Sequence, residues 1–207
     1  MGKMDAIYAA SPLWLQNAVV STYGLYWHWL RFGGSYKHHA QGYRQRADFT
    51  KEEWTRYQQS HLAALLSLCA DEVPYYRGVW TDSQKQAAKQ GDLQGLPLLE
   101  KEPIRIDPDA FCREGFHGPV LTFHTSGSTG TPIASKWTIS ELRNSLALRE
   151  VRSINWAGVS FKQPRATFSG RMVEPDPESK GPFYRFNSVE KQVYFSPFHL
   201  RQDTAHF

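Results

Sequence analysis

The clearest alternation of hydrophobic and polar positions runs from residue 50 to residue 74. Thr50 and Glu53 stand three residues apart, which predicts a capping box at the start of a helix. Pro74 predicts the end of this helix, because the residue before a proline is pushed out of the helical region. The apolar positions recur at helical spacing and are expected to form one buried face, with His61 packed there rather than acting as a ligand: Trp54, Tyr57, His61, Leu62, Leu65, Leu68 and Cys69.

Weaker patterns follow in the middle of the chain. The polar, alanine-rich run from 82 to 90 predicts a second, short helix. Residues 96–99 predict an extended segment that turns into a loop through residues 100–103.

After Gly118 the pattern changes to short β-prone runs. Strands are predicted at residues 120–124 and 133–137, followed by a helix at 140–154 in which Thr138 and Glu141 have capping-box spacing. Two further strands are predicted at 166–168 and 193–195, and a polar loop at 174–182 lies between them. This order is typical of an α/β layer arrangement.

The first fifty residues combine aromatic and basic side chains. Aromatic rings beside cations can stack bases and neutralise phosphates, so binding to single-stranded nucleic acid is one interpretation. No nucleic-acid-binding motif accompanies the pattern, which favours an irregular helical arm that packs on the rest of the protein. The residues concerned are Trp27, Trp29, Phe32, Tyr36, Tyr43 and Phe49, interleaved with Arg31, Lys37, Arg44 and Arg46.

The composition excludes a wholly disordered chain. Hydrophobic residues make up 41% and aromatic residues 14% of the 207 positions, which is enough for a buried core. Twenty-four Lys and Arg against 20 Asp and Glu leave a net charge of +4. This modest surplus suits a protein that handles anionic ligands such as nucleotides.

The cysteines and the N-terminal segment indicate in which cellular compartment the protein is expected. Cys69 and Cys112 form no CxxC pair, and the histidines show no ligand spacing, so no metal site on protein side chains is predicted. The apolar stretch 13–30 is interrupted by polar residues, which argues against a membrane span. The first residues lack a secretory signal. We therefore expect a soluble, cytoplasmic protein.

The loop at residues 125–132 carries the strongest chemical signal. It reads Thr-Ser-Gly-Ser-Thr-Gly-Thr-Pro, with two glycines and five hydroxyl residues directly after a predicted strand. Glycine lets the backbone approach a ligand closely, and the hydroxyl and backbone N–H groups form a concave set of donors. The residues themselves thus point to the binding of a polyphosphate.

Other motifs that hold phosphate or carry a nucleophile do not fit this loop. A Walker A loop requires a Gly-Lys pair, which residues 125–132 do not contain. The GxSxG pattern of a nucleophile elbow and the GxGxxG pattern of a dinucleotide site are also missing. An ordinary Ser/Gly turn remains the plain structural alternative.

The loop matches the phosphate-loop signature of the adenylate-forming (AMP-binding) superfamily, which includes acyl-CoA synthetases. Residues 73–77 (VPYYR) and 96–101 (LPLLEK), in this order before the loop, resemble the pattern of phenylacetate–CoA ligase-like proteins. Residues 168–171 (FSGR) and 193–200 (VYFSPFHL) resemble the capsule-biosynthesis-associated branch. The resemblance runs from about Trp14 to the end of the chain.

The resemblance implies an ATP-dependent ligase that activates a small-molecule carboxylic acid. The carboxylate attacks the α-phosphate of ATP with the help of Mg²⁺, which gives an acyl-adenylate and releases pyrophosphate. A thiol, usually that of coenzyme A, then takes the acyl group and releases AMP. It also implies that the loop holds the β- and γ-phosphates of the nucleotide. This role falls on Thr125, Ser126, Gly127, Ser128, Thr129, Gly130 and Thr131.

Two positions near the loop and the chain end modify this expectation. Many relatives carry Lys where Thr131 stands, and Lys136 is expected to lie nearby. Residues 196–200 resemble the family's next motif, which makes Phe198 and His199 candidates for the acyl pocket. A partly buried surface histidine is the other interpretation of His199.

The family's later motifs, which hold Mg²⁺, ribose and the catalytic lysine, do not occur in this sequence. We therefore expect the N-terminal part of a ligase, with a helical or irregular segment at 1–118 and a partial α/β nucleotide-binding subdomain with an incomplete sheet at 119–207. Such a chain is expected to be inactive alone, and no catalytic residue is assigned. The alternative is a truncated, non-catalytic remnant or nucleotide-binding module. The residues specify neither the acid nor the oligomeric state.

Overall fold

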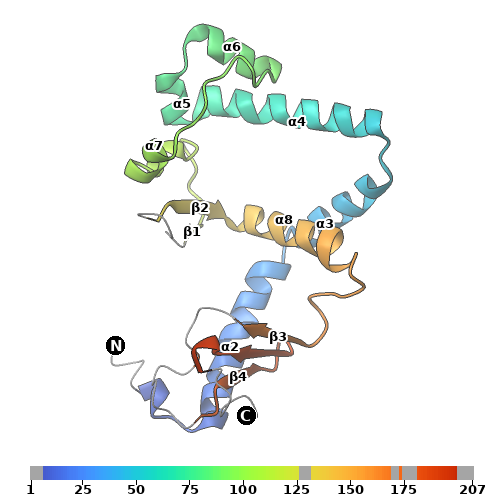
Figure 1. Cartoon of the computed structure of the whole chain (residues 1–207), viewed down its shortest axis with the longest axis vertical. Helices are drawn as coiled ribbons and strands as arrows, with labels where there is room; N and C mark the ends of the chain where they lie inside the picture. Colours follow the sequence, from blue (N-terminus) through green and yellow to red (C-terminus); the bar gives the residue numbers. More distant parts are fainter. Residues whose placement is uncertain (1–6, 126–131, 169–172, 174–180, 200–207) are drawn as a thin grey trace. The chain divides into compact units, whose positions relative to one another are not determined.

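The described residues form a mixture of helices and strands with two small open sheets, which confirms the general α/β class. The computed structural model describes residues 7–125, 132–168, 173 and 181–199 (Figure 1). Packing divides the chain into two units. The first comprises residues 1–43 and 143–207, and the second comprises residues 44–142.

The N-terminal arm is helical, as predicted, but it is more regular than expected. It consists of α2 (Leu13–Phe32) and α3 (Tyr36–Gln45). Its aromatic residues pack inward only in part: Phe32 lies 5.7 Å from the ring of Phe161, whereas Trp29 is 63% exposed. None of the helices in the described part of the chain has the length and apolar character needed to cross a membrane.

The helix predicted at 140–154 forms, but its last residues are π-helical and not α-helical. α8 (Ile139–Arg149) is followed by the π-helical turn η3 (Glu150–Ile154), and Thr138 and Glu141 form the predicted capping box. The buried carboxylate of Glu150 accepts hydrogen bonds from the Ser160 hydroxyl at 2.6 Å and from the Phe161 backbone N–H at 3.0 Å. These bonds tie the turn to the chain that follows it.

The first unit contains a three-stranded sheet. Its strands are β3 (Arg165–Phe168), β4 (Tyr184–Asn187) and β5 (Gln192–Phe195), in the order β3-β5-β4. The central strand β5 is parallel to β3 and antiparallel to β4. The sequence predicted β3 and β5. It missed β4, because this strand buries Arg185 and Asn187, which are polar residues that hydrophobic alternation assigns to the surface.

Helix α2 packs along β4 (Figure 1). The backbone N–H of Phe186 donates to Asn17 Oδ1 at 3.0 Å, and the backbone N–H of Ser188 donates to the Ser21 hydroxyl at 3.1 Å. Polar side chains of the helix thus satisfy backbone groups on this side of β4.

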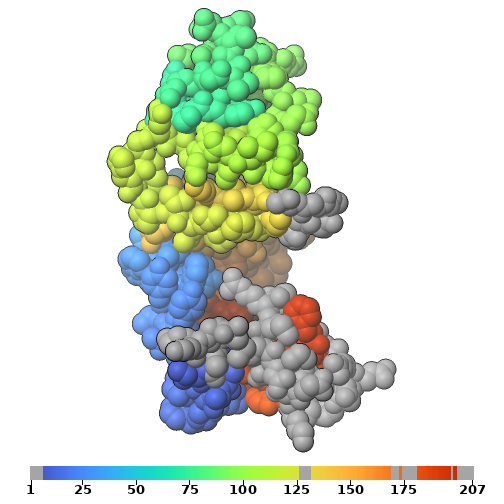
Figure 2. All heavy atoms as spheres, turned by 90° about the vertical axis from the view of Figure 1, so that its left-hand side faces the viewer, coloured from blue at the N-terminus to red at the C-terminus, as the bar shows by residue number. Residues whose placement is uncertain are grey.

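The second unit is mostly helical before its hairpin (Figure 1). Figure 2 shows the atoms of this helical part, coloured teal to green, packed in one continuous region. Its elements are η1 (Arg46–Asp48), α4 (Lys51–Glu72), α5 (Pro74–Val79), α6 (Asp82–Gln90), α7 (Lys101–Ile106), η2 (Asp109–Phe111), β1 (Val120–His124) and β2 (Ala134–Thr138). The Thr50–Glu53 capping box, the end of α4 before Pro74 and the short helix α6 are confirmed.

The buried face of α4 differs from the predicted one. The core consists of Leu66 and Ala70 from α4 with Trp80 and Ala88, whereas Leu65 is 57% exposed. Helical spacing alone leaves the orientation of the face open, and here the packing of α6 selects positions 62, 66, 69 and 70. The predicted burial of His61 on this face is also wrong, since His61 is exposed, with its ring tilted against that of Tyr57.

A short helix replaces the predicted loop at residues 100–103. α7 (Lys101–Ile106) places Pro103 in its first turn, where a missing N–H costs no intrahelical hydrogen bond. Arg105 pairs with Glu102 one turn away. A proline after charged residues is therefore compatible with a helix start as well as with a loop.

Candidate functional site

The Gly/Ser/Thr loop, which the sequence predicts to bind polyphosphate, connects the two strands of a β-hairpin. β1 and β2 are antiparallel, with Val120 opposite Thr138 and His124 opposite Ala134. The predicted second strand is thus confirmed with a shift of one residue. Of the candidate loop residues, Thr125 is described, and Ser126, Gly127, Ser128, Thr129, Gly130 and Thr131 lie outside the described residues.

The two ends of the loop are joined by hydrogen bonds. The backbone N–H of Thr125 donates to the Ile133 carbonyl at 3.1 Å, and the Ile133 N–H donates to the Thr125 hydroxyl at 3.0 Å. Thr125 is therefore held by a hydrogen bond of its side chain as well as by one of its backbone. The hairpin holds both ends of a glycine-rich segment in one place.

The hairpin has one apolar and one polar face. Residues opposite each other in antiparallel strands share a face. One face carries Leu121, Phe123 and Trp137, with the rings of Phe123 and Trp137 6.1 Å apart. The other face carries Thr122 opposite Lys136, together with His124.

Lys136 on the polar face forms an ion pair with Asp109 of the η2 turn. The turn itself is anchored by Phe111, whose ring stacks on Tyr75 at 4.2 Å and meets Tyr76 edge-on at 5.7 Å. Asp109 also accepts a backbone hydrogen bond from Cys112 at 3.0 Å. The polar face of the hairpin thus carries Lys136, the cation that was expected near the loop.

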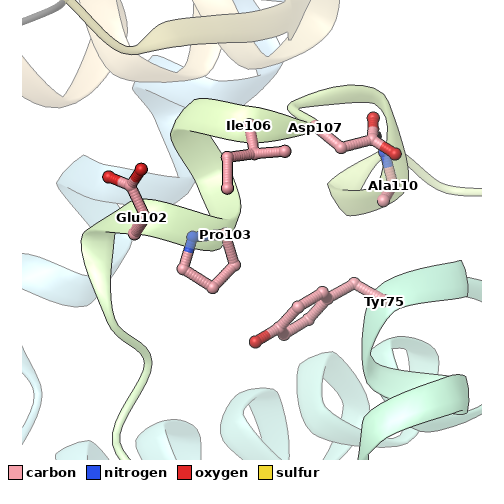
Figure 3. Close-up of a pocket in the computed structure, with 6 residues that line it drawn as sticks. All are labelled: Tyr75, Glu102, Pro103, Ile106, Asp107 and Ala110. Carbon is pink, nitrogen blue, oxygen red and sulfur yellow. Dashed lines mark hydrogen bonds between the residues drawn. The ribbon is translucent and has the colours of Figure 1, made fainter.

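A separate open pocket of about 440 Å³ lies beside the η2 turn (Figure 3). In Figure 3 the rings of Tyr75 and Pro103 and the side chain of Ile106 face the same space, while the carboxylates of Glu102 and Asp107 point away from the Tyr75 ring. Hydrogen bonds from Arg105 hold the pKa of Glu102 below its ordinary value. The wall of this pocket suits an apolar group.

The acyl-pocket candidates Phe198 and His199 lie in the first unit. They belong to the short turn η4 (Pro197–His199), which follows β5. Phe198 is 57% exposed, whereas His199 is buried, stacks on Phe183 with ring centroids 4.6 Å apart, and has Nδ1 2.8 Å from the Ser196 hydroxyl. The two candidates thus have opposite environments. Only Phe198 presents its side chain to solvent.

A buried charge cluster, which no sequence pattern indicated, surrounds Glu190. Its carboxylate accepts hydrogen bonds from Arg31 at 2.6 Å and from Arg165 at 3.0 Å, and it lies 3.6 Å from His28 Nδ1. Arg165 also donates to Gln192 at 2.7 Å. The partners are up to 162 positions apart, so no local motif could have indicated the cluster.

Two further features of the described residues concern the cysteine thiols and the grouping of side chains that could bind a metal ion. Burial raises the pKa of both Cys69 and Cys112, and Glu141 and Asp107 add to the effect at Cys112. A thiol with a raised pKa is a poor nucleophile at neutral pH. In the part of the chain that the structure describes, no group of three or more His, Cys, Asp or Glu could hold a metal ion.

Comparison of the chain with models of known protein families, with curated proteins and with solved structures found no match.

Proposed function

We propose that this chain belongs to an ATP-dependent, adenylate-forming ligase that activates a carboxylic acid, and that the β1–β2 connection binds the phosphates of the nucleotide. One observation carries the proposal. A segment of two glycines and five hydroxyl residues joins two antiparallel strands whose ends are held together at Thr125 and Ile133. The resemblance of this segment and its flanks to phenylacetate–CoA ligase-like proteins supports the choice of reaction.

The part of this chain in such a reaction is binding and orientation. Hydroxyl and backbone N–H donors of the loop would hold the β- and γ-phosphates in place and neutralise charge on the pyrophosphate leaving group. Because hydrogen bonds join the two ends of the loop, the loop would lose less conformational entropy when it binds the phosphates. Phe198, the exposed member of the acyl-pocket pair, is the residue we assign to contact with the acid.

The chemistry at the α-phosphate comes from the bound substrates. ATP would supply the adenylyl group with pyrophosphate as the leaving group, Mg²⁺ bound to its phosphates would balance their charge, and coenzyme A is the proposed final acceptor. Mg²⁺ in nucleotide sites is usually held by substrate phosphates and water with few carboxylates.

The first experiment measures binding of MgATP to the 207-residue chain by calorimetry. We expect Gly127→Ala and Thr129→Ala to weaken binding by about tenfold each, because each change disturbs the donor array. Matched controls are Gly78→Ala, where an added methyl group meets no atom within 4 Å, and Thr55→Ala on the exposed side of α4. Both controls should bind ATP like the unchanged chain.

The second experiment tests the reaction by ATP–pyrophosphate exchange with a panel of aliphatic and aromatic acids. Exchange that depends on an acid and on Gly127 supports the ligase. Binding of ATP without exchange supports a nucleotide-binding module instead. Equal ATP binding by the chain, Gly127→Ala and Gly78→Ala rules out the loop as the phosphate site.

A further inference from the structure

We propose that the exposed face of α2 is the contact surface between two copies of this chain, which pair antiparallel about a two-fold axis at Thr22. The inference goes beyond the proposed function and does not depend on the binding of a nucleotide. It starts from the orientation of α2, which packs on the sheet with its polar side.

The side of α2 that meets β4 carries polar and small residues. Asn17 and Ser21 accept backbone N–H groups from β4 and from the residue that follows the strand, at 3.0 Å and 3.1 Å. Gly24 lies against the buried side chain of Asn187. A helix on a sheet ordinarily buries its apolar stripe, whereas α2 leaves its apolar residues on the opposite side.

This opposite side forms an uncharged and largely apolar face. The sequence has no Lys, Arg, Asp or Glu between residues 13 and 30. With 3.6 residues per turn, the exposed positions of α2 in this stretch cover roughly half of the circumference of the helix. We call the following exposed residues the α2 face: Trp14, Leu15, Ala18, Val19, Thr22, Tyr23, Leu25, Tyr26 and Trp29.

The area of the α2 face is comparable with what one partner contributes to a stable interface. Trp14, Tyr23, Tyr26 and Trp29 are each more than half exposed. An aromatic side chain buries about 150–250 Å² when it is covered, so these four offer roughly 350–600 Å². The aliphatic members raise the total to roughly 450–800 Å², and a standard interface uses about 600–1,000 Å² per partner.

An axis at Thr22 lets the α2 faces of two copies overlap over their whole length. The face extends from Trp14 to Trp29, and Thr22 lies beside its midpoint along the helix and near its centre around the helix. Antiparallel pairing about this point sets Ala18 opposite Tyr26 of the second copy, so a small residue faces a large one. The Thr22 hydroxyl donates to the Ala18 carbonyl at 2.9 Å, so its burial leaves no donor unpaired.

A second copy suits the α2 face better than a lipid surface does. Helices that lie on anionic membranes carry Lys or Arg beside the apolar stripe. Arg31, the basic residue in the last turn of α2, instead donates to the buried Glu190 at 2.6 Å. An uncharged face also brings no like charges together across a two-fold axis, although the whole chain has a net charge of +4.

The test places a charge on the axis and measures the mass of the 207-residue chain by sedimentation velocity over a dilution series. We expect the unchanged chain to dimerise with a dissociation constant of about 1–10 μM. Thr22→Arg and Thr22→Glu each bring two like charges together and should weaken the dimer at least about a hundredfold. An equimolar mixture of the two variants should dimerise again, because opposite charges then meet at the axis.

Thr55→Arg is the matched control for the change of charge. Thr55 is exposed on α4, and its hydroxyl donates to the Lys51 carbonyl one turn earlier at 2.9 Å, as the Thr22 hydroxyl does in α2. The control should leave the dissociation constant within about twofold. Thermal unfolding verifies that each variant is folded, and Val19→Lys, a second charge on the α2 face, takes the place of a Thr22 variant that does not fold.

Disulfide trapping tests the antiparallel register. In a chain with Cys69→Ser and Cys112→Ser, Thr22→Cys should form a disulfide-linked dimer under mild oxidation, because two cysteines at the axis come within bonding distance. Ala18→Cys is the control, since its two copies would lie about 12 Å apart along the helices. Equal linkage at both positions would indicate a parallel pair and overturn the register.

Three other results would overturn the inference. The first is a chain that stays monomeric up to about 100 μM. The second is a dimer that Thr22→Arg weakens no more than Thr55→Arg does. The third is a monomer that sediments with phosphatidylcholine–phosphatidylglycerol vesicles and loses this binding in Thr22→Glu, which would assign the α2 face to lipid. Each of these results leaves the proposed nucleotide site untouched, since that site is tested by ATP binding.

Discussion

A Cβ atom on Gly24 would lie 2.2 Å from Nδ2 of Asn187, so the helix α2 can approach strand β4 only because this position is glycine. Asn187 is 1% exposed, and its Oδ1 accepts the backbone N–H of Glu190 at 3.3 Å. The side chain therefore has little room to move aside. The contact between one glycine and one amide sets the distance between helix and sheet.

Gly24→Ala is expected to destabilise the protein by about 1–3 kcal/mol, because the clash with Asn187 outweighs the better helix propensity of alanine, which is worth about 1 kcal/mol. Urea unfolding followed by circular dichroism measures the change. Gly78→Ala, in α5 with open space around it, is the control and should be neutral or stabilising. Equal stability of the two variants would show that helix and sheet do not meet this closely.

Glu190→Gln is expected to cost about 3–5 kcal/mol of unfolding free energy. The substitution leaves Arg31 and Arg165 without the carboxylate that compensates their charge, and the Glu190 side chain is only 1% exposed. Glu114→Gln is the matched control, because Glu114 pairs with Arg77 at the surface, with side chains 56% and 45% exposed. Its effect should be far smaller. Similar losses in both variants would contradict a structural role for the cluster.

The capping box of α4 predicts a defined pH dependence. Hydrogen bonds from the Thr50 backbone N–H and hydroxyl lower the pKa of Glu53 in the folded protein. Its contribution to stability is therefore complete above the ordinary glutamate pKa and is lost as the pH falls through the lowered folded pKa. The stability difference between the protein and Glu53→Gln should follow this course in acid titrations of urea midpoints. A difference that grows toward acid pH has the wrong sign for this mechanism.

The two thiols should react slowly in the folded protein. Burial raises the pKa of Cys69 and Cys112, which lowers the thiolate fraction at neutral pH. We expect the rate with a disulfide reagent to rise on unfolding in urea and, in the folded protein, to keep rising with pH beyond the ordinary thiol pKa. A fast reaction of either thiol at pH 7 would indicate an activated cysteine. Cys69→Ser and Cys112→Ser identify which thiol is measured.

Local features of this protein follow from the sequence. The capping boxes at Thr50 and Thr138 join side chains and backbone groups three residues apart, so the same few residues decide whether they form. The end of α4 before Pro74 and the bounds of α6 are local in the same sense. The β-prone runs on both sides of the Gly/Ser/Thr loop also predicted β1 and β2. The two strands of the hairpin at the candidate site were therefore predictable from the sequence.

Tertiary structure decided which positions are buried and which distant groups meet. Helical spacing in α4 allowed several faces, and packing against α6 and Trp80 selected the one with Leu66 and Ala70. In β4, Asn187 is buried against Gly24 of α2, and Glu190 meets Arg31 across 159 positions. The pairing of Lys136 with Asp109 arose in the same way. Burial and charge pairing depend on the segment that packs opposite, and that segment is chosen by the free energy of the whole fold.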